Sequence, residues 1–562
     1  MNSTDHAEDS TGVVPTRIAI AFVALALVYK MLVVARINVN WDEFYFLSHV
    51  YTFRRGQLDQ FFQTAYVHLF TWVTNIPGSE VDQIVTARRL MVLLLGVTAA
   101  LIWKLARTWL APFPTAIALF AYLTCYPVLL HGGSFRIDSL LAPLTVAIVL
   151  ALVRCAPGPR RDWVVGILSG LAFAATVKAA LVAPLVAALV WLRSPDRSAD
   201  RSMALRDCAT SLFRIGATAA VIAVVLLGLH RLSLAGAQTE GTADFATRVV
   251  TRTLLDVPWL PRVDYLVHAF RSQPLPWLLI LIGATVAMAR RQFALLAMAL
   301  SLWPLLVYRN AFPYYYVVML APACVLAGYA VQWVLESIDR SRFRALTRAF
   351  ALLVLTGLLI NGRAYLLMVA KDEQSTQRTL IAGIHSIFRA PVLYIDRCGM
   401  VSSFPKANFF MSTWGMAAYR EQGIPVFAAI VRQRKPSFLI ENAAALFPDQ
   451  DGQSGLLPED FELLTRHYIQ YWGPVRVAGG QGVASQDGLV IDVPFPGRYR
   501  LWSQSDVLVN GVKRSPGAVI DVPAGGVRVT SIAPRPELVR LLIAAANPPP
   551  PEPHPAPIFT GL

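Results

Sequence analysis

The sequence predicts a polytopic α-helical membrane protein with about eleven spans, followed by a C-terminal soluble domain that combines an α/β part with a β-sandwich. Three observations predict this class. Of the 562 residues, 55% are hydrophobic and only 15% are charged, whereas soluble globular chains carry about 25% charged residues. The mean hydropathy is +0.50. Apolar stretches long enough to cross the hydrocarbon core recur through the first two thirds of the chain, so a soluble enzyme is excluded.

The net charge of +15 is concentrated in the apolar part of the chain. Residues 371–562 hold 18 basic and 16 acidic residues, whereas residues 1–370 hold 32 and 19. A basic surplus between apolar stretches is typical of membrane topology rather than of a nucleic-acid-binding face, so no nucleic-acid partner is expected. The five cysteines form no CxxC pair, and only Cys398 lies outside the apolar part. We therefore expect neither a zinc site nor a disulfide within the C-terminal domain.

Eleven segments have the length and apolar character of membrane spans. The fifth and sixth are nearly continuous, but their 31 residues exceed one crossing even with tilt, so we interpret them as two spans that fold back at Lys178. The predicted spans are 17–36, 87–106, 112–130, 138–153, 163–177, 179–193, 211–231, 275–289, 292–308, 314–335 and 347–368.

Lys and Arg residues are unequally shared between alternate loops, which predicts the orientation in the membrane. The richly basic set should face the cytoplasm, and the other set has one basic residue in each short loop. The protein is then integral to the inner or plasma membrane. The predicted parts are a cytoplasmic tail (1–16), a membrane domain (17–368) with long outer loops at 37–86 and 232–274, an extracytoplasmic domain (369–546) and a disordered proline-rich tail (547–562).

Local patterns predict elements outside the spans. The aromatic run from Glu43 to Phe53 reads as a helix lying in the membrane interface, ended by Gly56. Buried strands between helices are predicted at residues 391–400 (PVLYIDRCGM) and 435–443 (KPSFLIENA). From residue 474 onward, short alternating strands predict a β-sandwich, with a hairpin at Asn510-Gly511.

Asp42 and Glu43 follow the first span directly, in the run NVNWDEFYF. Such carboxylates are consistent with an ordinary helix cap, because Asp is favoured just before a helix. They are also consistent with a general base that takes a proton from a hydroxyl. Ionisable groups at membrane depth are costly and frequently functional. The residues alone leave both interpretations open.

Four further stretches follow in order: TARRLMVLLLGVTAALIWKLAR, SFRIDSLLAP, GILSGLAFAATVKAALVAPL and RNAFPYYYVVMLAPA. Together with the Asp-Glu pair and its aromatic helix, they resemble the GT-C fold glycosyltransferases. The resemblance is nearer to the branch of aminoarabinose transferases and protein O-mannosyltransferases, and it covers residues 17 to about 335. Each motif is weak singly, and their shared order on the predicted outer side carries the resemblance.

The resemblance implies a polyprenyl-phosphate-linked sugar as donor and transfer at the outer face to a hydroxyl or amine. The acceptor would be a lipid, a glycan or a protein, and no cofactor or metal is expected. By motif, Asp42 matches the catalytic acidic residue and is the expected base, with Glu43 beside it and Asp138 at the second acidic position. Lys178 and Arg309 fall where the family places cations facing the lipid phosphate. Cations there would stabilise the charge that develops on the leaving phosphate.

Four more residues are candidate substrate contacts: His68, Tyr45, Arg136 and Tyr315. Many relatives carry a Lys-Pro-Pro or His-Pro-Pro step after the Asp-Glu helix. Here the stretch FQTAYVHLFTWV has neither, and His68 is its nearest polar candidate.

Ordinary interpretations stand beside these assignments. His68 could be an interfacial histidine satisfied by a neighbour. Lys178 could be a lysine that reaches the interface, and Arg136 could pair with Asp138 structurally. Arg88 and Arg89 are interpreted as headgroup anchors.

Two other functions compete with glycosyl transfer. A transporter or flippase of lipid-linked substrates would show broken helices with charges at the bilayer midplane and inverted halves, whereas the charges here gather on one predicted face. A scaffold that only presents the C-terminal domain would leave Asp42, Asp138 and Lys178 without a role.

Overall fold

The computed structural model describes residues 10–194, 201–234, 260–338, 344–443, 446, 455–551 and 557–559. The chain divides into two compact units. The first, which we call the helical unit, consists of residues 1–37, 53–73 and 85–371. The second, the α/β unit, consists of residues 38–52, 74–84 and 372–562. The sequence placed 38–52 and 74–84 in an outer loop of the membrane domain, whereas in the structure they belong with the C-terminal domain.

Helices lie at each of the eleven predicted spans, and most of the predicted outer loop 232–274 lies outside the described residues. The α-helices are α1 (Ser10–Val33), α3 (Val67–Phe70), α4 (Glu80–Ala106, which begins in the α/β unit), α5 (Pro112–Thr124), α6 (Tyr126–His131), α7 (Ile137–Arg154), α8 (Pro159–Ala175), α9 (Ala183–Leu192), α10 (Arg201–Leu232), α12 (Val263–Ser272), α13 (Pro274–Ala289), α14 (Phe293–Leu296), α15 (Pro304–Val307), α16 (Tyr316–Ser337) and α17 (Arg344–Val369). Short 3₁₀ helices are η1 (Thr71–Asn75), η2 (Val177–Val182), η5 (Ala297–Leu302) and η6 (Pro313–Tyr315).

Six helices in the described ranges are long and apolar enough to cross a membrane, and the bent pair α12–α13 would make a seventh. Three shorter apolar stretches, at Pro112–Thr124, Val177–Leu192 and Phe293–Val307, add to them. The polytopic helical class is confirmed, and the number of about eleven spans stays a prediction.

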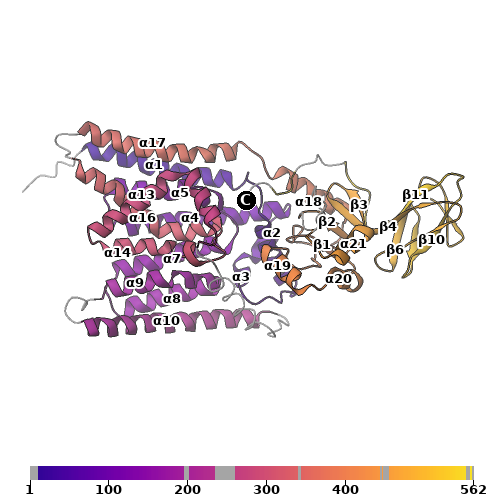
Figure 1. Cartoon of the computed structure of the whole chain (residues 1–562), viewed down its shortest axis with the longest axis horizontal. Helices are drawn as coiled ribbons and strands as arrows, with labels where there is room; N and C mark the ends of the chain where they lie inside the picture. The colour runs from indigo at the N-terminus through magenta and orange to yellow at the C-terminus, as the bar shows by residue number, and fades with distance from the viewer. Residues whose placement is uncertain are drawn as a thin grey trace, which may run out of the picture. The chain divides into compact units, whose positions relative to one another are not determined.

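Helix α16 forms the centre of the helical unit (Figure 1). Every residue from 316 to 331 is buried, as expected for a helix that is apolar on all sides. It packs against α5, α7 and α13. On α8, Gly166 and Gly170 lie against α10, where an added Cβ would come within 2.6 Å of Thr218 and 2.7 Å of Ile222. Small residues four apart allow this close helix contact.

In its described residues, the α/β unit contains α2 (Trp41–Arg54), α18 (Ser375–Ile387), α19 (Thr413–Gln422), α20 (Phe427–Arg434) and α21 (Pro458–His467), with eleven strands in two sheets. One sheet has the order β1-β2-β4-β11-β6-β9, with β3 also on β4, and the other has the order β5-β10-β7-β8. The strands are β1 (Tyr394–Ile395), β2 (Phe438–Ile440), β3 (Tyr468–Trp472), β4 (Val475–Ala484), β5 (Leu489–Ile491), β6 (Gly497–Trp502), β7 (Val507–Val509), β8 (Val512–Arg514), β9 (Val519–Val522), β10 (Val527–Ser531) and β11 (Glu537–Ile543).

The strand pairing changes near residue 474, where the sequence predicted that an α/β part gives way to short alternating strands. β1 and β2 are parallel and pack with helices, whereas the strands after residue 474 pair antiparallel. Asn510 and Gly511 join β7 to β8 with φ of 47° and 80°. Two positive φ values are what a two-residue type I′ hairpin requires, so the predicted hairpin is confirmed. Residue Phe559 of the proline-rich tail packs edge-on against Trp41 of α2, with ring centroids 5.7 Å apart.

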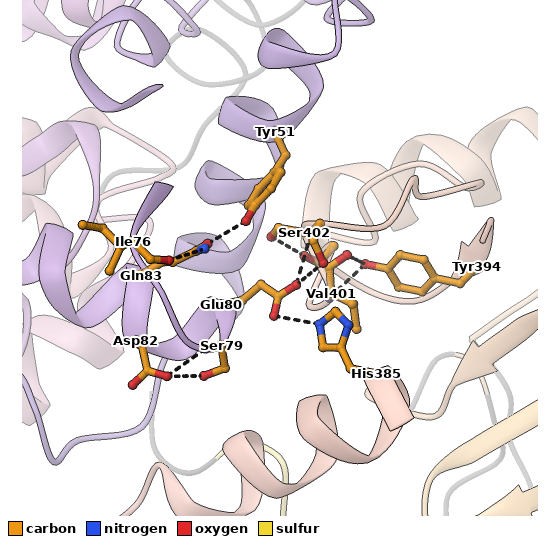
Figure 2. A network of polar contacts seen from close by, with 12 residues as sticks. Tyr51, Ile76, Ser79, Glu80, Asp82, Gln83, His385, Tyr394, Val401 and Ser402 are labelled. Atoms are coloured by element: carbon orange, nitrogen blue, oxygen red, sulfur yellow. Dashed lines mark hydrogen bonds and ion pairs between the residues drawn. The ribbon is translucent and has the colours of Figure 1, made fainter. Parts of the chain in front are cut away.

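Side chains from α18 explain why residues 38–52 and 74–84 fold with the α/β unit. Gln377, fully buried, accepts from the backbone N–H of Val39 and donates to its carbonyl, at 2.9 and 2.8 Å. Glu80 at the start of α4 accepts from Ser403, and its other oxygen lies 3.3 Å from His385 Nε2 (Figure 2). These contacts tie both segments to elements more than 300 residues away in sequence.

Asp460, fully buried in the first turn of α21, holds the start of α20. Its carboxylate accepts from the backbone N–H groups of Val426, Phe427 and Ala428, and from the hydroxyl of Tyr419 at 2.7 Å. Three amides at a helix start have no partner within the helix, so a carboxylate from another helix caps α20 here. Burial, and then the bond to Asp460, raise the pKa of Tyr419.

We expect Asp460→Ala to lower the free energy of unfolding of the α/β unit by about 3 kcal/mol, because several buried donors lose a charged acceptor at once. Hydrogen exchange on the full chain should show faster exchange of the α20 amides. Glu459→Ala is the matched control, since this neighbour in the same turn is exposed. Equal protection of α20 in both variants would contradict the capping role.

Candidate functional site

The start of α2 is organised by a capping box. Asn40 stands at the N-cap: its side-chain oxygen accepts from the backbone N–H of Asp42 at 2.9 Å, and Glu43 accepts from the backbone N–H of Asn40 at 3.1 Å. This reciprocal pair satisfies two helix-start donors. Glu43 is fully buried, whereas Asp42 is partly exposed. The capping role therefore belongs to Asn40 and Glu43, and the interpretation of Asp42 as the cap is wrong.

A loop after β1 places an arginine beside the start of α2, within the α/β unit. Asp396, fully buried at the end of β1, shapes this loop by accepting from the N–H groups of Gly399 and Met400, both at 2.8 Å. The guanidinium of Arg397 lies over the ring of Trp41, with its carbon 3.7 Å from the ring centroid. Burial lowers the pKa of Arg397, and the nearby Cys398 and Asp42 oppose this effect. A cation therefore lies near Asp42.

Tyr45 is part of an aromatic group on the same helix. Its ring stacks on Phe410 at a centroid distance of 4.0 Å and meets His49 edge-on at 4.2 Å. Burial lowers the pKa of His49 to about 4, so this histidine is neutral at physiological pH. Tyr45 is thus held in place by aromatic packing.

In the helical unit, the structure brings together Asp138, Lys178 and Arg136. Asp138 lies in the first turn of α7 and is 2% exposed. One carboxylate oxygen lies 3.5 Å from Lys178 Nζ, and the other lies 3.5 Å from Arg136 Nε. Lys178 can reach this position because α8 ends at Ala175, where Thr176 turns the chain into extended backbone before η2. The predicted break near Lys178 is therefore confirmed.

Aromatic rings cover the two cations. The guanidinium of Arg136 lies 3.5 Å from the ring centroid of Tyr314, and Lys178 Nζ lies 4.4 Å from that of Tyr315. The Tyr315 hydroxyl lies 3.4 Å from that of Tyr308. Cation–π contacts of this kind keep charges in place while leaving donors available.

A largely apolar pocket adjoins Lys178. Its polar lining includes Lys178, Tyr308, Tyr315 and Thr145, whose buried hydroxyl has no hydrogen-bond partner among the described residues. The remaining lining is mostly aliphatic and comes from α7, η2 and α16, including Leu141, Leu181, Val182, Val318 and Met319. The pocket thus places the ammonium group of Lys178 beside apolar side chains.

Arg309 and His68 make contacts with other residues. Arg309 is exposed directly after Tyr308, and its carbonyl accepts from Arg262. His68 Nε2 lies 3.0 Å from Nδ1 of His230 on α10. Burial lowers the pKa of His68. The histidine pair fits the interpretation of His68 as a residue satisfied by a neighbour.

Two buried cations hold the end of α1. One was assigned another role from the sequence, and the other was not singled out. Arg88, 1% exposed, donates to the carbonyls of Val34 and Ile37, both at 3.0 Å. Lys30 donates to the carbonyls of Leu129 and Leu130. Cations at a helix end satisfy its last carbonyls. The interpretation of Arg88 as a headgroup anchor is wrong, because it fixes where the chain leaves α1.

The trio of Glu80, His385 and Ser403 is not a nucleophile triad. Its carboxylate is in the middle: the serine hydroxyl donates to Glu80, and His385 contacts the other oxygen (Figure 2). A catalytic serine requires the histidine as its direct base. The trio therefore joins segments of the fold.

No family model matches the chain, and no curated protein matches it. Among solved structures, the chain is similar to ArnT from Cupriavidus metallidurans bound to undecaprenyl phosphate, at 16% identity and a TM-score of 0.54, over 84% of this chain and 98% of that one. It is also similar to the archaeal oligosaccharyltransferase AglB from Archaeoglobus fulgidus, in complex with an inhibitory peptide and a dolichol-phosphate, at 13% identity and a TM-score of 0.53, over 92% and 76%. The ArnT structure in the apo state gives a TM-score of 0.51 at 16% identity, over 82% and 98%.

These similarities show the fold. The chain has the GT-C architecture shared by ArnT and AglB, and the similarity extends over most of its length. The predicted fold class is confirmed, including a C-terminal region rich in β-structure.

Proposed function

We propose that this protein is a membrane glycosyltransferase that moves a sugar from a polyprenyl-phosphate donor to an acceptor hydroxyl or amine on the outer face of the membrane. The observation that carries the proposal is the cluster of Asp138, Lys178 and Arg136 beside an apolar pocket, in a chain with the GT-C fold. The structures of ArnT and AglB were solved with polyprenyl and dolichol phosphates. The acceptor is a lipid, a glycan or a protein.

In the proposed reaction, the donor phosphate binds beside Lys178 and Arg309, and its tail occupies the apolar groove. As the glycosidic bond breaks, the bonding electrons pass to the phosphate oxygen, and the cations stabilise the growing charge. Asp138 holds Lys178 and Arg136 in position. Lys acts as a point charge, whereas Arg can bind two phosphate oxygens.

Asp42 is the proposed base. It takes the proton of the acceptor as the new bond forms, the usual role of a carboxylate in such transfers. Glu43 supports this by capping α2, and Arg397 places a cation near Asp42. Tyr45 and Tyr315 are proposed sugar or acceptor contacts, and His68 is the least supported of the candidate contacts.

The proposed orientation has the N-terminus in the cytoplasm and the C-terminal domain outside, based on the Lys and Arg asymmetry of the loops. The chemistry then uses donors presented on the outer face. Flippase activity is not favoured, because the GT-C neighbours are transferases.

Deletion of the gene should remove one sugar from the cell envelope. Mass spectrometry of envelope lipids, glycans and glycoproteins should find a single missing substituent, which identifies donor and acceptor together. The complementing gene should restore it, and the Asp42→Asn version should not. An unchanged envelope under conditions in which the protein is made would contradict the proposal.

A further inference from the structure

Another pocket, which is polar, lies at the opposite end of α8 from Lys178. It has a volume of about 210 Å³ and is lined by residues from the start of α8, the end of α9 and the first half of α10. α8 has 17 residues, so its two ends are roughly 25 Å apart at 1.5 Å per residue. The pocket is therefore separate from the proposed donor site.

Arg161 is one of the residues that line this pocket. It is only 4% exposed. Its Nε and Nη2 donate to one oxygen of Asp162, at 3.2 and 3.0 Å, and Nη2 also donates to Ser211 at 2.9 Å. Its third nitrogen, Nη1, is buried without a hydrogen-bond partner among the described residues.

Ser194 also has a buried donor without a hydrogen-bond partner among the described residues. This residue lines the same pocket, and the donor is its hydroxyl. A buried donor that stays unpaired costs about 1–3 kcal/mol. Two such donors in one pocket, which is large enough for a small polar group, indicate that the pocket holds something.

The charges of the pocket favour an anion. Asp162 already accepts from Arg161 and, at 2.7 Å, from Ser211, and it lies 3.6 Å from Arg214. Its charge is thus matched by Arg161, and Arg214 remains as a second cation that lines the pocket. Asp207 also lines the pocket and is exposed. The amide groups at the start of α8 add to the positive potential.

We propose that this pocket binds a phosphate group through Arg161 Nη1, Arg214 and the hydroxyl of Ser194. Phosphate fits better than a halide because it offers several acceptor oxygens to a guanidinium and a hydroxyl at once. The phosphate belongs either to a membrane phospholipid headgroup or to a free phosphate. The site is independent of the proposed glycosyl transfer.

Native mass spectrometry of the purified full chain with phosphatidylglycerol tests whether the pocket binds a phospholipid headgroup. We expect wild type to retain one lipid tightly, and Arg161→Met to bind it about tenfold or more weakly, since a charge-assisted contact is lost. Arg160→Met is the matched control: Arg160 precedes Arg161 and is exposed, so this variant should retain the lipid. Equal loss in both arginine variants, or none in either, would overturn lipid binding at this pocket.

Thermal unfolding in a neutral detergent with inorganic phosphate tests whether the pocket binds free phosphate. A phosphate-dependent rise in Tm for wild type and Arg160→Met, absent in Arg161→Met, supports a free phosphate. If neither lipid retention nor the phosphate shift depends on Arg161, the proposal is wrong.

Arg161 also joins α8 to α10, so Arg161→Met can fail by misfolding. Ser194→Ala and Arg214→Gln remove pocket donors while leaving the contacts of Arg161 with Asp162 and Ser211 intact. Both should unfold like wild type without phosphate and still lose phosphate or lipid binding. Wild-type binding in both folded variants would overturn the proposal.

Discussion

Asp42→Asn is expected to reduce turnover by roughly 10²–10⁴-fold, the usual contribution of general base catalysis. Asn keeps the size and much of the hydrogen bonding of Asp but cannot accept the acceptor's proton. Donor binding should survive, because the cations and the apolar groove that hold the donor belong to other residues. The measurement is single-turnover sugar transfer together with donor affinity for the purified variant.

Glu43→Gln is the matched control for this prediction. Glu43 is buried and completes the capping box through the N–H of Asn40, so its loss should lower stability by about 1 kcal/mol with little direct effect on chemistry. The two variants should thus separate, one in turnover and the other in Tm. A folded Asp42→Asn protein that binds donor and turns over near the wild-type rate would show that Asp42 is not the base.

Lys178→Ala is expected to weaken use of the polyprenyl-phosphate donor by about 10- to 100-fold, since a charge-assisted contact to phosphate contributes roughly 1.5–3 kcal/mol. The same substitution at Arg309 should have an effect in the same direction. Steady-state kinetics against donor concentration would show the loss mainly in KM, if the contact is already made in the ground state.

Removing Lys178 also takes a cation from the buried Asp138. Lys178→Arg keeps the charge and should restore most of the donor affinity, whereas a general packing defect would not be rescued. Normal donor kinetics in both Lys178→Ala and Arg309→Ala would place the phosphate elsewhere.

The sequence was sufficient wherever local pattern decides structure. Helices lie at each of the eleven apolar segments predicted as spans. The aromatic run predicted α2, and Gly56 at φ 67° ends it as expected. Asn510-Gly511 predicted its hairpin because few other dipeptides adopt two positive φ values. Asp138 and Lys178 were found from motif order, and the structure places them 3.5 Å apart.

Long-range partners were beyond the reach of local pattern. Arg397 lies 356 residues after Trp41, and only the fold of the loop after β1 brings it there. An Asp-Arg pair directly after a buried strand was the one available signal, since polar residues at strand ends frequently serve a site. Arg88 was misassigned because an arginine near the start of a span usually faces headgroups, whereas here it is buried by its contacts with the end of α1.

Local pattern also could not predict that parts of the outer loop 37–86 belong to different units. Residues 38–52 follow a span and look like part of the membrane domain, but Gln377 and the loop after β1 hold them in the α/β unit. The proposed base is therefore carried by the unit that includes the C-terminal domain. All candidate site residues predicted from the sequence precede residue 369.

In the proposed function, the protein breaks the bond between sugar and lipid phosphate. The direct measurement uses purified protein in liposomes with lipid-linked sugars from the deletion strain, radiolabelled in the sugar and separately in the phosphate, and envelope acceptors from the same strain. We expect the sugar label to move to the acceptor while polyprenyl phosphate appears one for one, and Asp42→Asn to slow both by roughly 10²–10⁴-fold. Donor that crosses the bilayer with both labels still joined would contradict the proposed function.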